Sequence, residues 1–216
     1  MTPYSQKAGI TLYHGDCREV LPGLPMFDLV LTDPPYGIAE VWKGGFGHGW
    51  GKARQETEAR NAWDSSAPDA ATLSLVLSHG KEQAVWGGNY FSLPPSRGWL
   101  VWTKPERNFS LSEAELAWTS RDTVMRVFDG VRSDQGREHP TQKPLSLMVW
   151  RLEKFAKSKT VLDPFSGSGT TLLAALKMQR EATGIEREER WCELTAKRIE
   201  RELSQGDLFV KREATP

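Results

Sequence analysis

The stretch "TVLDPFSGSGTTLLAAL", residues 160–176, holds a short apolar run, a glycine-containing turn and the beginning of an apolar helix. The apolar run ends at Asp163, and Gly167 and Gly169 lie in the turn that follows. Glycine lets a backbone approach a ligand closely, and the helix that begins near Thr170 offers unpaired N–H groups at its N-terminus. The pattern therefore predicts a ligand site at the carboxyl end of a strand in an α/β protein.

The next apolar run, "ATGIE" at 182–186, ends in Glu186. In nucleotide-binding βαβ units an acid about twenty residues after the turn accepts hydrogen bonds from a ribose diol. No Gly-Lys-Ser/Thr sequence ends the turn, so a phosphate-binding P-loop is not expected. A dinucleotide site would have a third glycine where this helix is apolar, although a nicotinamide dehydrogenase is still an alternative. S-adenosylmethionine, an adenosine-bearing ligand without a pyrophosphate, fits a two-glycine turn better.

Further nearly continuous apolar runs are typical of strands that are buried on both faces of a parallel sheet. These are "ITLYHGD" (10–16), "FDLVLTD" (27–33), "QAVWGG" (83–88) and "WLVWTK" (99–104).

Helical periodicity appears between and after these runs, at 144–156, 170–178 and 187–203, whereas 205–216 is expected to be a frayed tail. The alternation predicts a doubly wound, mostly parallel α/β sheet in a single domain over residues 1–216.

The composition excludes several classes of protein. The 28 Lys and Arg residues balance the 28 Asp and Glu residues, so a nucleic-acid site would have to be a local basic surface. Two distant cysteines and four scattered histidines predict neither a disulfide framework nor a metal site. The N-terminus lacks a signal pattern, and no long apolar run is present, so we expect a cytoplasmic protein without a membrane segment.

Two segments interrupt the alternation, at about 37–66 and about 120–143. The first is rich in glycine and then charged, which is typical of a functional lid or a disordered loop, and the second is rich in arginine. Both are expected to contact a polyanion through phosphate-binding side chains. The candidates are Lys43, Lys52, Arg54, Arg60, Arg126, Arg132 and Arg137.

"TDPPYGI", residues 32–38, directly follows the apolar run that ends at Thr32. Two prolines remove backbone donors and fix φ, so this segment is a stiff turn and not the middle of a helix or strand. Such a turn can hold an acid, its carbonyl groups and an aromatic ring toward a ligand.

Three motifs together resemble those of the DNA amino-methyltransferases that modify adenine N6 or cytosine N4: "DPPY" (33–36), "FSGSGTT" (165–171) and "HPTQKP" (139–144). The first motif precedes the second in the chain, as in the circularly permuted β class of that family. "HGDC" (14–17) is similar to the family's acidic motif, and "GGNYF" (87–91) and "LSEAELAWTS" (111–120) resemble small solitary members from phages and prophages. The resemblance implies a Rossmann-like, permuted methyltransferase fold.

The resemblance also implies a catalytic role for Asp33, Pro34, Pro35 and Tyr36. An exocyclic amino group is a poor nucleophile because its lone pair is delocalised into the ring. Asp33 and the carbonyl of Pro34, held by proline rigidity, would accept its two protons, and Tyr36 would stack on the base. The base has to be flipped out of the duplex to reach such a pocket.

The methyl donor implied by the family is S-adenosylmethionine, and the resemblance assigns residues to its site one by one. Glu186 holds the ribose, Lys143 pairs with the donor's carboxylate, and Asp16 contacts the donor or the target base. The complete set is Asp16, Thr141, Gln142, Lys143, Asp163, Pro164, Phe165, Gly167, Gly169, Thr170 and Glu186.

The expected activity is thus methyl transfer to DNA, with adenine N6 favoured and cytosine N4 as the alternative, since a serine in place of Asp33 would favour cytosine. Methyl transfer to RNA or to protein, usually with asparagine at this place, and an inactive DNA-binding relative are less favoured. The recognition segments are small, and a homodimer would supply the missing recognition surface. The chain contains no nuclease-like motif, so no restriction partner is expected within it.

Overall fold

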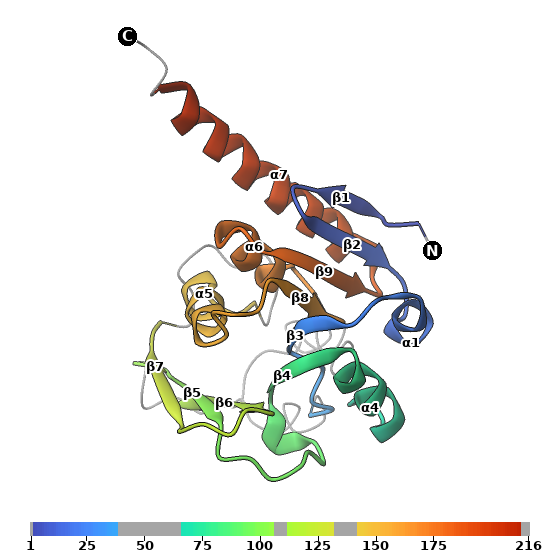
Figure 1. Ribbon diagram of the computed structural model, residues 1–216, viewed down its shortest axis with the longest axis vertical. Coiled ribbons are helices and arrows are strands. Elements are labelled where there is room, and N and C mark those ends of the chain that lie inside the picture. Colours follow the sequence, from blue (N-terminus) through green and yellow to red (C-terminus); the bar gives the residue numbers. More distant parts are fainter. Residues whose placement is uncertain (1, 39–65, 106–111, 132–141, 213–216) are drawn as a thin grey trace, which may run out of the picture.

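The computed structural model describes residues 2–38, 66–105, 112–131 and 142–212, with side chains described as far as residue 205. These residues form a nine-stranded sheet in the order β1-β2-β9-β8-β3-β4-β6-β5-β7 (Figure 1). The strands are β1 (Ser5–Lys7), β2 (Ile10–His14), β3 (Phe27–Thr32), β4 (Gly80–Trp86), β5 (Trp99–Thr103), β6 (Ala114–Thr119), β7 (Arg126–Asp129), β8 (Thr160–Asp163) and β9 (Glu181–Glu186). The α-helices are α1 (Cys17–Val20), α4 (Ala70–Ser78), α5 (Leu145–Lys154), α6 (Thr170–Lys177) and α7 (Glu189–Arg212), and short 3₁₀ turns span Leu21–Gly23 and Gly88–Tyr90.

The five central strands β2, β9, β8, β3 and β4 are parallel to one another. β1 pairs antiparallel with β2 at one edge. At the other edge β6 runs antiparallel to both β4 and β5, and β7 is parallel to β5. The prediction of a mostly parallel sheet is therefore confirmed.

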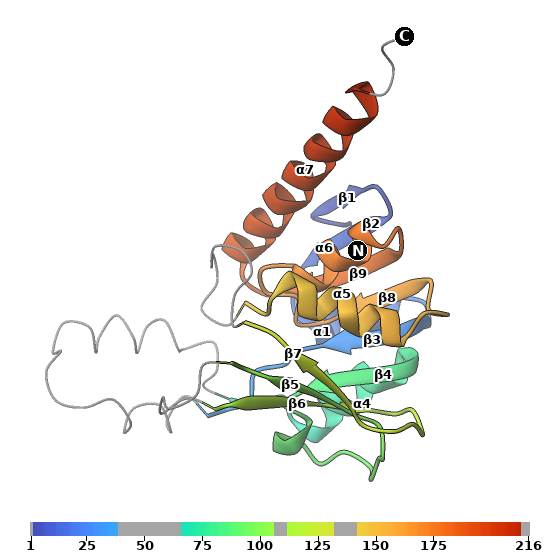
Figure 2. The same ribbon diagram turned by 90° about the vertical axis from the view of Figure 1, so that its left-hand side faces the viewer.

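Helices cover both faces of this sheet (Figures 1 and 2). Along β3, Leu29 and Leu31 pack into one core with side chains of α5, α6 and α7, whereas Val30 packs into a second core with α1 and α4. All three side chains are fully buried. Burial on both faces explains why the strand is a continuous apolar run and not an alternating one.

The six apolar runs correspond to β2, β3, β4, β5, β8 and β9, and the three periodic segments correspond to α5, α6 and α7. One expectation is wrong. The tail predicted to fray from residue 205 continues as part of α7 to Arg212, and this helix projects beyond the sheet (Figure 2). The many charged residues of α7 suit a helix that is solvated over much of its surface.

The two irregular segments fall largely outside the described residues. Of 37–66 the structure describes 37, 38 and 66, and of 120–143 it describes 120–131 and 142–143, which include β7. Lys43, Lys52, Arg54, Arg60, Arg132 and Arg137 lie outside, whereas Arg126 is an exposed residue of β7. None of the helices in the described part of the chain has the length and apolar character needed to cross a membrane.

Candidate active site

Four acidic residues lie at the carboxyl ends of four adjacent parallel strands. In spatial order they are Asp16 after β2, Glu186 at the end of β9, Asp163 at the end of β8 and Asp33 after β3. The carboxyl ends of parallel strands meet at one edge of the sheet, and ligands of open α/β sheets bind there. The fold thus brings together acids that are up to 170 residues apart in the sequence (186 − 16).

A cavity of about 240 Å³ opens at this edge. Most of the predicted site residues line it. They are Asp16, Asp33, Pro35, Gln142, Lys143, Asp163, Pro164, Phe165, Gly167, Thr170 and Glu186. Pro34, Tyr36 and Gly169 lie next to lining residues but are not part of the wall, and Thr141 lies outside the described residues.

The turn between β8 and α6 uses its two glycines differently. Gly169, with φ +73°, precedes the first residue of α6, and a Cβ there would lie 2.3 Å from the Thr195 side chain of α7. Gly167, with φ +51°, has no atom within 4 Å of an added Cβ, and it lines the cavity. Both positions have the left-handed backbone that glycine adopts without strain. Gly169 is required for packing, and Gly167 keeps the cavity open.

Glu186 closes this turn from the neighbouring strand. Its Oε2 accepts a hydrogen bond from Gly167 N at 2.9 Å, and its Oε1 accepts one from Glu188 N at 2.8 Å. Burial raises the pKa of Glu186, and the two backbone donors oppose that shift. A carboxylate has about four lone-pair sites, so Glu186 keeps acceptor capacity for a ligand hydroxyl.

Asp163 is 2% exposed and connects β8 to β3. Its Oδ1 accepts hydrogen bonds from Thr32 Oγ1 at 2.8 Å and from Phe165 N at 3.2 Å. Burial raises the pKa of Asp163 to about 6 despite these donors. Asp163 therefore holds β3 and the turn together as well as lining the cavity.

Asp16 combines a local role with its place in the cavity wall. It is the N-cap of α1, and its side chain accepts hydrogen bonds from Arg18 N at 2.9 Å and from Arg18 Nη2 at 2.6 Å. The hydrogen bonds from the Arg18 side chain lower the pKa of Asp16 to about 2. Asp16 is thus a capping acid that also faces the cavity.

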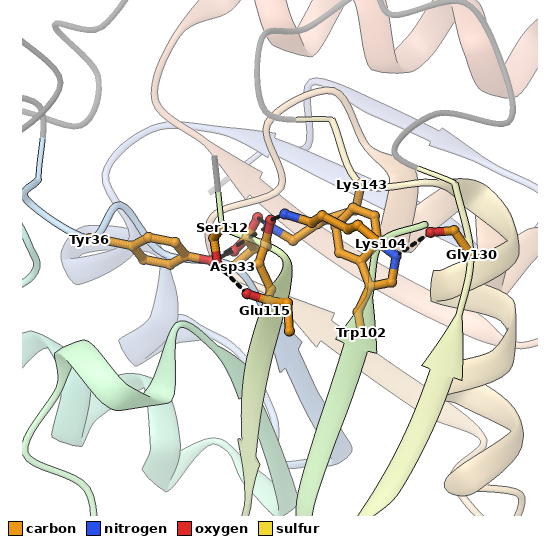
Figure 3. Close-up of polar contacts among 9 residues, drawn as sticks. Asp33, Tyr36, Trp102, Lys104, Ser112, Glu115, Gly130 and Lys143 are labelled. Atoms are coloured by element: carbon orange, nitrogen blue, oxygen red, sulfur yellow. Dashed lines mark hydrogen bonds and ion pairs between the residues drawn. The ribbon is translucent and has the colours of Figure 1, made fainter. Parts of the chain in front are cut away.

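Both oxygens of Asp33 already accept a hydrogen bond (Figure 3). Tyr36 Oη donates to Oδ1 at 2.6 Å, and Lys143 Nζ donates to Oδ2 at 2.7 Å. We expected Lys143 to pair with a donor carboxylate. In the structure its ammonium lies between Asp33 and Glu115, at 3.0 Å from Glu115 Oε2.

The ring of Tyr36 stacks on Tyr90, with centroids 4.9 Å apart and an interplanar angle of 17°. Phe91 lies edge-on at 6.3 Å. Burial raises the pKa of Tyr36 well above its ordinary value, so the phenol is a proton donor at neutral pH. Gly87 makes this packing possible, because a Cβ there would lie 2.2 Å from the Tyr36 ring.

Glu115 and Lys104 are part of the site, and sequence reasoning missed them. Glu115 lies in β6 and receives a hydrogen bond from Lys104, which directly follows β5. Burial alone would raise the pKa of Glu115, but Lys143 and Lys104 lower it to about 2. Burial likewise tends to lower the pKa of Lys143, but Asp33 and Glu115 raise it above its ordinary value. The available signal was a charged residue within or directly after each of two largely apolar strand sequences.

Comparison with known proteins identifies a matching family and several relatives. The profile of the DNA methylase family, N6_N4_Mtase, matches residues 79–197. M.ScaI, a type II methyltransferase of Streptomyces caespitosus, is 28% identical over 265 aligned positions that cover 93% of this chain and 84% of the relative.

Two solved structures share the fold. PvuII DNA methyltransferase, described as cytosine-N4-specific, has a TM-score of 0.58 at 16% identity, with 90% of this chain and 89% of that chain covered. TTHA0409 from Thermus thermophilus, complexed with S-adenosylmethionine, has a TM-score of 0.50 at 21% identity, with 88% and 95% covered. The predicted Rossmann-like methyltransferase fold is therefore confirmed. Because the profile spans more than half of the 216 residues, this chain belongs to the DNA methylase family of N6/N4 amino-methyltransferases.

Proposed function

We propose that this protein transfers a methyl group from S-adenosylmethionine to the N6 amino group of an adenine flipped out of duplex DNA. One observation carries the proposal: Asp33 and the glycine turn at 163–170 line the same cavity. A catalytic acceptor and a donor-binding turn are thus within reach of one bound molecule. The alternative of an inactive relative is disfavoured because both parts are intact.

The cavity residues fit an adenosine-bearing sulfonium donor. Glu186 has spare acceptor capacity for a ribose diol, and Gly167 leaves room beside it. When bound, this donor supplies an activated methyl group. The protein's own contribution is to position the acceptor base and to polarise its amino group.

Asp33 and Pro34 perform that polarisation. A carboxylate oxygen that already accepts one hydrogen bond can accept a second, so Asp33 can bind an amino proton while Tyr36 and Lys143 stay in place. The Pro34 carbonyl accepts the other proton. As both protons are held, the nitrogen lone pair becomes available for attack on the methyl group. Asp33 acts as an acceptor and orienter, and the proton leaves to water after transfer.

Adenine is proposed over cytosine because residue 33 is an aspartate, where a serine would favour cytosine N4. The order of the chain, with the catalytic strand β3 ahead of the donor strand β8, supports membership of the circularly permuted β class. The similarity of 87–91 and 111–120 to phage and prophage proteins supports a solitary enzyme of that origin.

The remaining site residues take their roles under the same proposal. Asp163, Pro164, Phe165, Gly169 and Thr170 form the donor turn, Thr141 and Gln142 close the opposite side, and Lys143 is assigned to Asp33 and not to the donor. We further propose a single catalytic domain over 1–216 that acts in the cytoplasm, with the segments 37–66 and 120–143 contacting DNA. A homodimer would supply recognition surface that so small a chain lacks.

The test is transfer of a radiolabelled methyl group from S-adenosylmethionine to unmethylated duplex DNA, with RNA and protein acceptors in parallel. We expect label in duplex DNA with the wild type and none with Asp33→Ala. A thermal shift with S-adenosylmethionine but not with NAD should accompany the transfer. Label in RNA or protein alone, or a shift with NAD alone, would refute the proposal.

A further inference from the structure

Four charged side chains form an alternating row that ends at the catalytic carboxylate (Figure 3). Lys104 Nζ contacts Glu115 Oε1, Glu115 Oε2 lies 3.0 Å from Lys143 Nζ, and Lys143 Nζ donates to Asp33 Oδ2 at 2.7 Å. The four residues come from the end of β5, from β6, from the segment before α5 and from the end of β3. The row therefore joins β5 and β6, toward one edge of the sheet, to the site at the end of β3.

The burial of the two lysines shows that the row is built as a unit. Their side chains are 4% and 10% exposed, whereas those of Glu115 and Asp33 are 25% and 23% exposed. A buried ammonium is costly unless it is paired and hydrogen-bonded. Two lysines and two acids leave the row without net charge, so removal of one member leaves another uncompensated.

Glu115 does not line the cavity. Among the described residues, it is Lys143 that connects Glu115 to the site. A lysine side chain has four flexible methylene groups, so a single contact with Asp33 would not fix it. Glu115 gives the ammonium a second anchor on the side away from Asp33. Tyr36 then holds one oxygen of Asp33 while the anchored Lys143 holds the other.

We propose that Glu115, with Lys104 paired behind it, is a positioning residue for methyl transfer that anchors Lys143 against Asp33. This inference rests on the proposed function, because the carboxylate so held is the acceptor for the amino group of the base. An acceptor fixed from both sides meets the amino proton without reorganising in the transition state. Glu115 therefore acts on the rate of transfer and leaves the donor site unchanged.

The primary test is Glu115→Gln, which keeps the shape of the side chain and removes its charge. The turnover number for DNA methylation should fall roughly 10-fold to 100-fold, as misplacement of a reacting group predicts. The dissociation constant for S-adenosylmethionine, measured by calorimetry, should change by less than about threefold, which is well below a tenfold change in affinity. A matched loss of donor affinity would overturn the proposal.

Glu202→Gln is the matched control. Glu202 is also 25% exposed and also pairs with a lysine, Lys177, but it lies on α7 away from the cavity. Its variant should methylate DNA at the wild-type rate. An equal loss of turnover in both variants would show a general effect of removing an ion pair and would refute a specific role for Glu115.

A double variant separates positioning from stability. Glu115→Gln alone removes the carboxylate that compensates the charge of the buried Lys104 ammonium, which lowers the melting temperature. In Lys104→Met/Glu115→Gln the charge is balanced again, so the melting temperature should recover toward the wild type while turnover stays low. Recovery of turnover together with stability would show that the row serves the fold alone.

NMR tests the contact between Glu115 and Lys143 without a measurement of catalysis. In ¹⁵N-lysine-labelled protein, the Lys143 ammonium, assigned with Lys143→Arg, should give a resonance protected from solvent exchange in the wild type. That resonance should be lost in the double variant, and its persistence would refute the anchoring role. If the wild type methylates no duplex, the proposed function fails, and this resonance still decides whether Glu115 anchors Lys143.

Discussion

In the proposed reaction the chemistry depends on Asp33, whose two oxygens each accept a hydrogen bond. Asp33→Asn preserves the shape but replaces one acceptor oxygen with an NH₂ group. That group would face either the Lys143 ammonium or the Tyr36 hydroxyl. The turnover number should therefore fall by roughly 10²–10³-fold, as for removal of one hydrogen-bonding partner of a transition state.

Steady-state methylation of duplex DNA measures this loss, and calorimetry with S-adenosylmethionine supplies the control. Donor affinity should stay close to that of the wild type, because Asp33 is assigned to the base and not to the donor. Turnover above a tenth of the wild-type value would contradict the role of Asp33 as the acceptor.

Asp163 predicts a pH dependence of stability with a definite sign. Burial raises the pKa of Asp163 from about 3.8 to about 6, so between these values the folded chain holds a proton that the unfolded chain releases. The contribution to stability is present at low pH and is lost as the pH rises through this window. Asp163→Asn cannot ionise and should gain stability relative to the wild type from about pH 4 to about pH 6.5.

Urea unfolding of both proteins at the two ends of this window checks the prediction. The opposite contribution of Glu115, whose pKa is lowered to about 2, is common to both proteins and cancels in the difference. A difference in unfolding free energy that does not change with pH would contradict the raised pKa of Asp163.

Individual acids were predictable, whereas their partners were not. Asp33, Asp163 and Glu186 each follow an apolar run, and this pattern is visible in the sequence. Glu115 is 82 residues from Asp33 (115 − 33) and meets the site because β6 turns back between β4 and β5. No local pattern encodes that return, so the anchoring of Lys143 by Glu115 appears only in three dimensions.

Among the structural elements, the turn before α6 makes a prediction with an internal control. Gly169→Ala places a methyl group 2.3 Å from Thr195 and strains a left-handed residue, so it should lower the melting temperature strongly. Gly167→Ala meets nothing within 4 Å, so it should cost roughly the 1–2 kcal/mol of the left-handed backbone alone. Its methyl group enters the cavity wall, and donor affinity should therefore fall more than in Gly169→Ala.

Thermal unfolding and donor calorimetry on both variants measure the two effects separately. If Gly167→Ala were the less stable variant and Gly169→Ala the weaker donor binder, the assignment of packing to Gly169 and cavity space to Gly167 would be reversed.

Helix α5 carries a buried arginine that has no role in the proposed mechanism. Arg151 is 0% exposed, lies 4.3 Å over the Trp86 ring, and its guanidinium nitrogens have no hydrogen-bond partner among the described residues. Burial lowers the pKa of Arg151 to about 9 although Asp33, Tyr36 and Asp163 oppose that shift, so the guanidinium keeps its charge at neutral pH at a cost in desolvation. Arg151→Leu should raise the free energy of unfolding by roughly 1–3 kcal/mol.

Chemical denaturation at neutral pH measures the effect of this substitution, with Lys154→Leu on the exposed side of α5 as the control. A decrease in the free energy of unfolding in Arg151→Leu would show that the guanidinium has a stabilising partner and would contradict the prediction.

Elements with unbroken apolar runs or clear periodicity could be predicted. Elements that are very short, or whose apolar pattern is interrupted by a charged residue, could not. β3 and β8 are buried on both faces, so their sequences stand out. β6 carries Glu115 in its first half, which interrupts the apolar pattern, and β1 is three residues long and too short to show any period. The sequence from residue 205, which contains Gly206, was predicted to be a frayed tail, yet α7 continues to Arg212.

The arrangement of the complete sheet explains why two distant motifs form one site. β3 and β8 are neighbours, and the chain leaves them in opposite directions, with α6 leading toward β9 on one side and α4 toward β4 on the other. Such a reversal of strand order opens a crevice at the carboxyl ends. The sequence predicted parallel strands but not their order, because order is decided by which helices pack on which face.

The central claim is that this site methylates adenine N6 in DNA. Nucleosides from the genomic DNA of a methylation-deficient host that expresses the protein can be separated and identified by mass spectrometry. The account predicts N6-methyladenine with the wild type and background levels with Asp33→Asn expressed to the same level. N4-methylcytosine without N6-methyladenine would contradict the assignment of the base, and unmodified DNA would contradict the proposed activity itself.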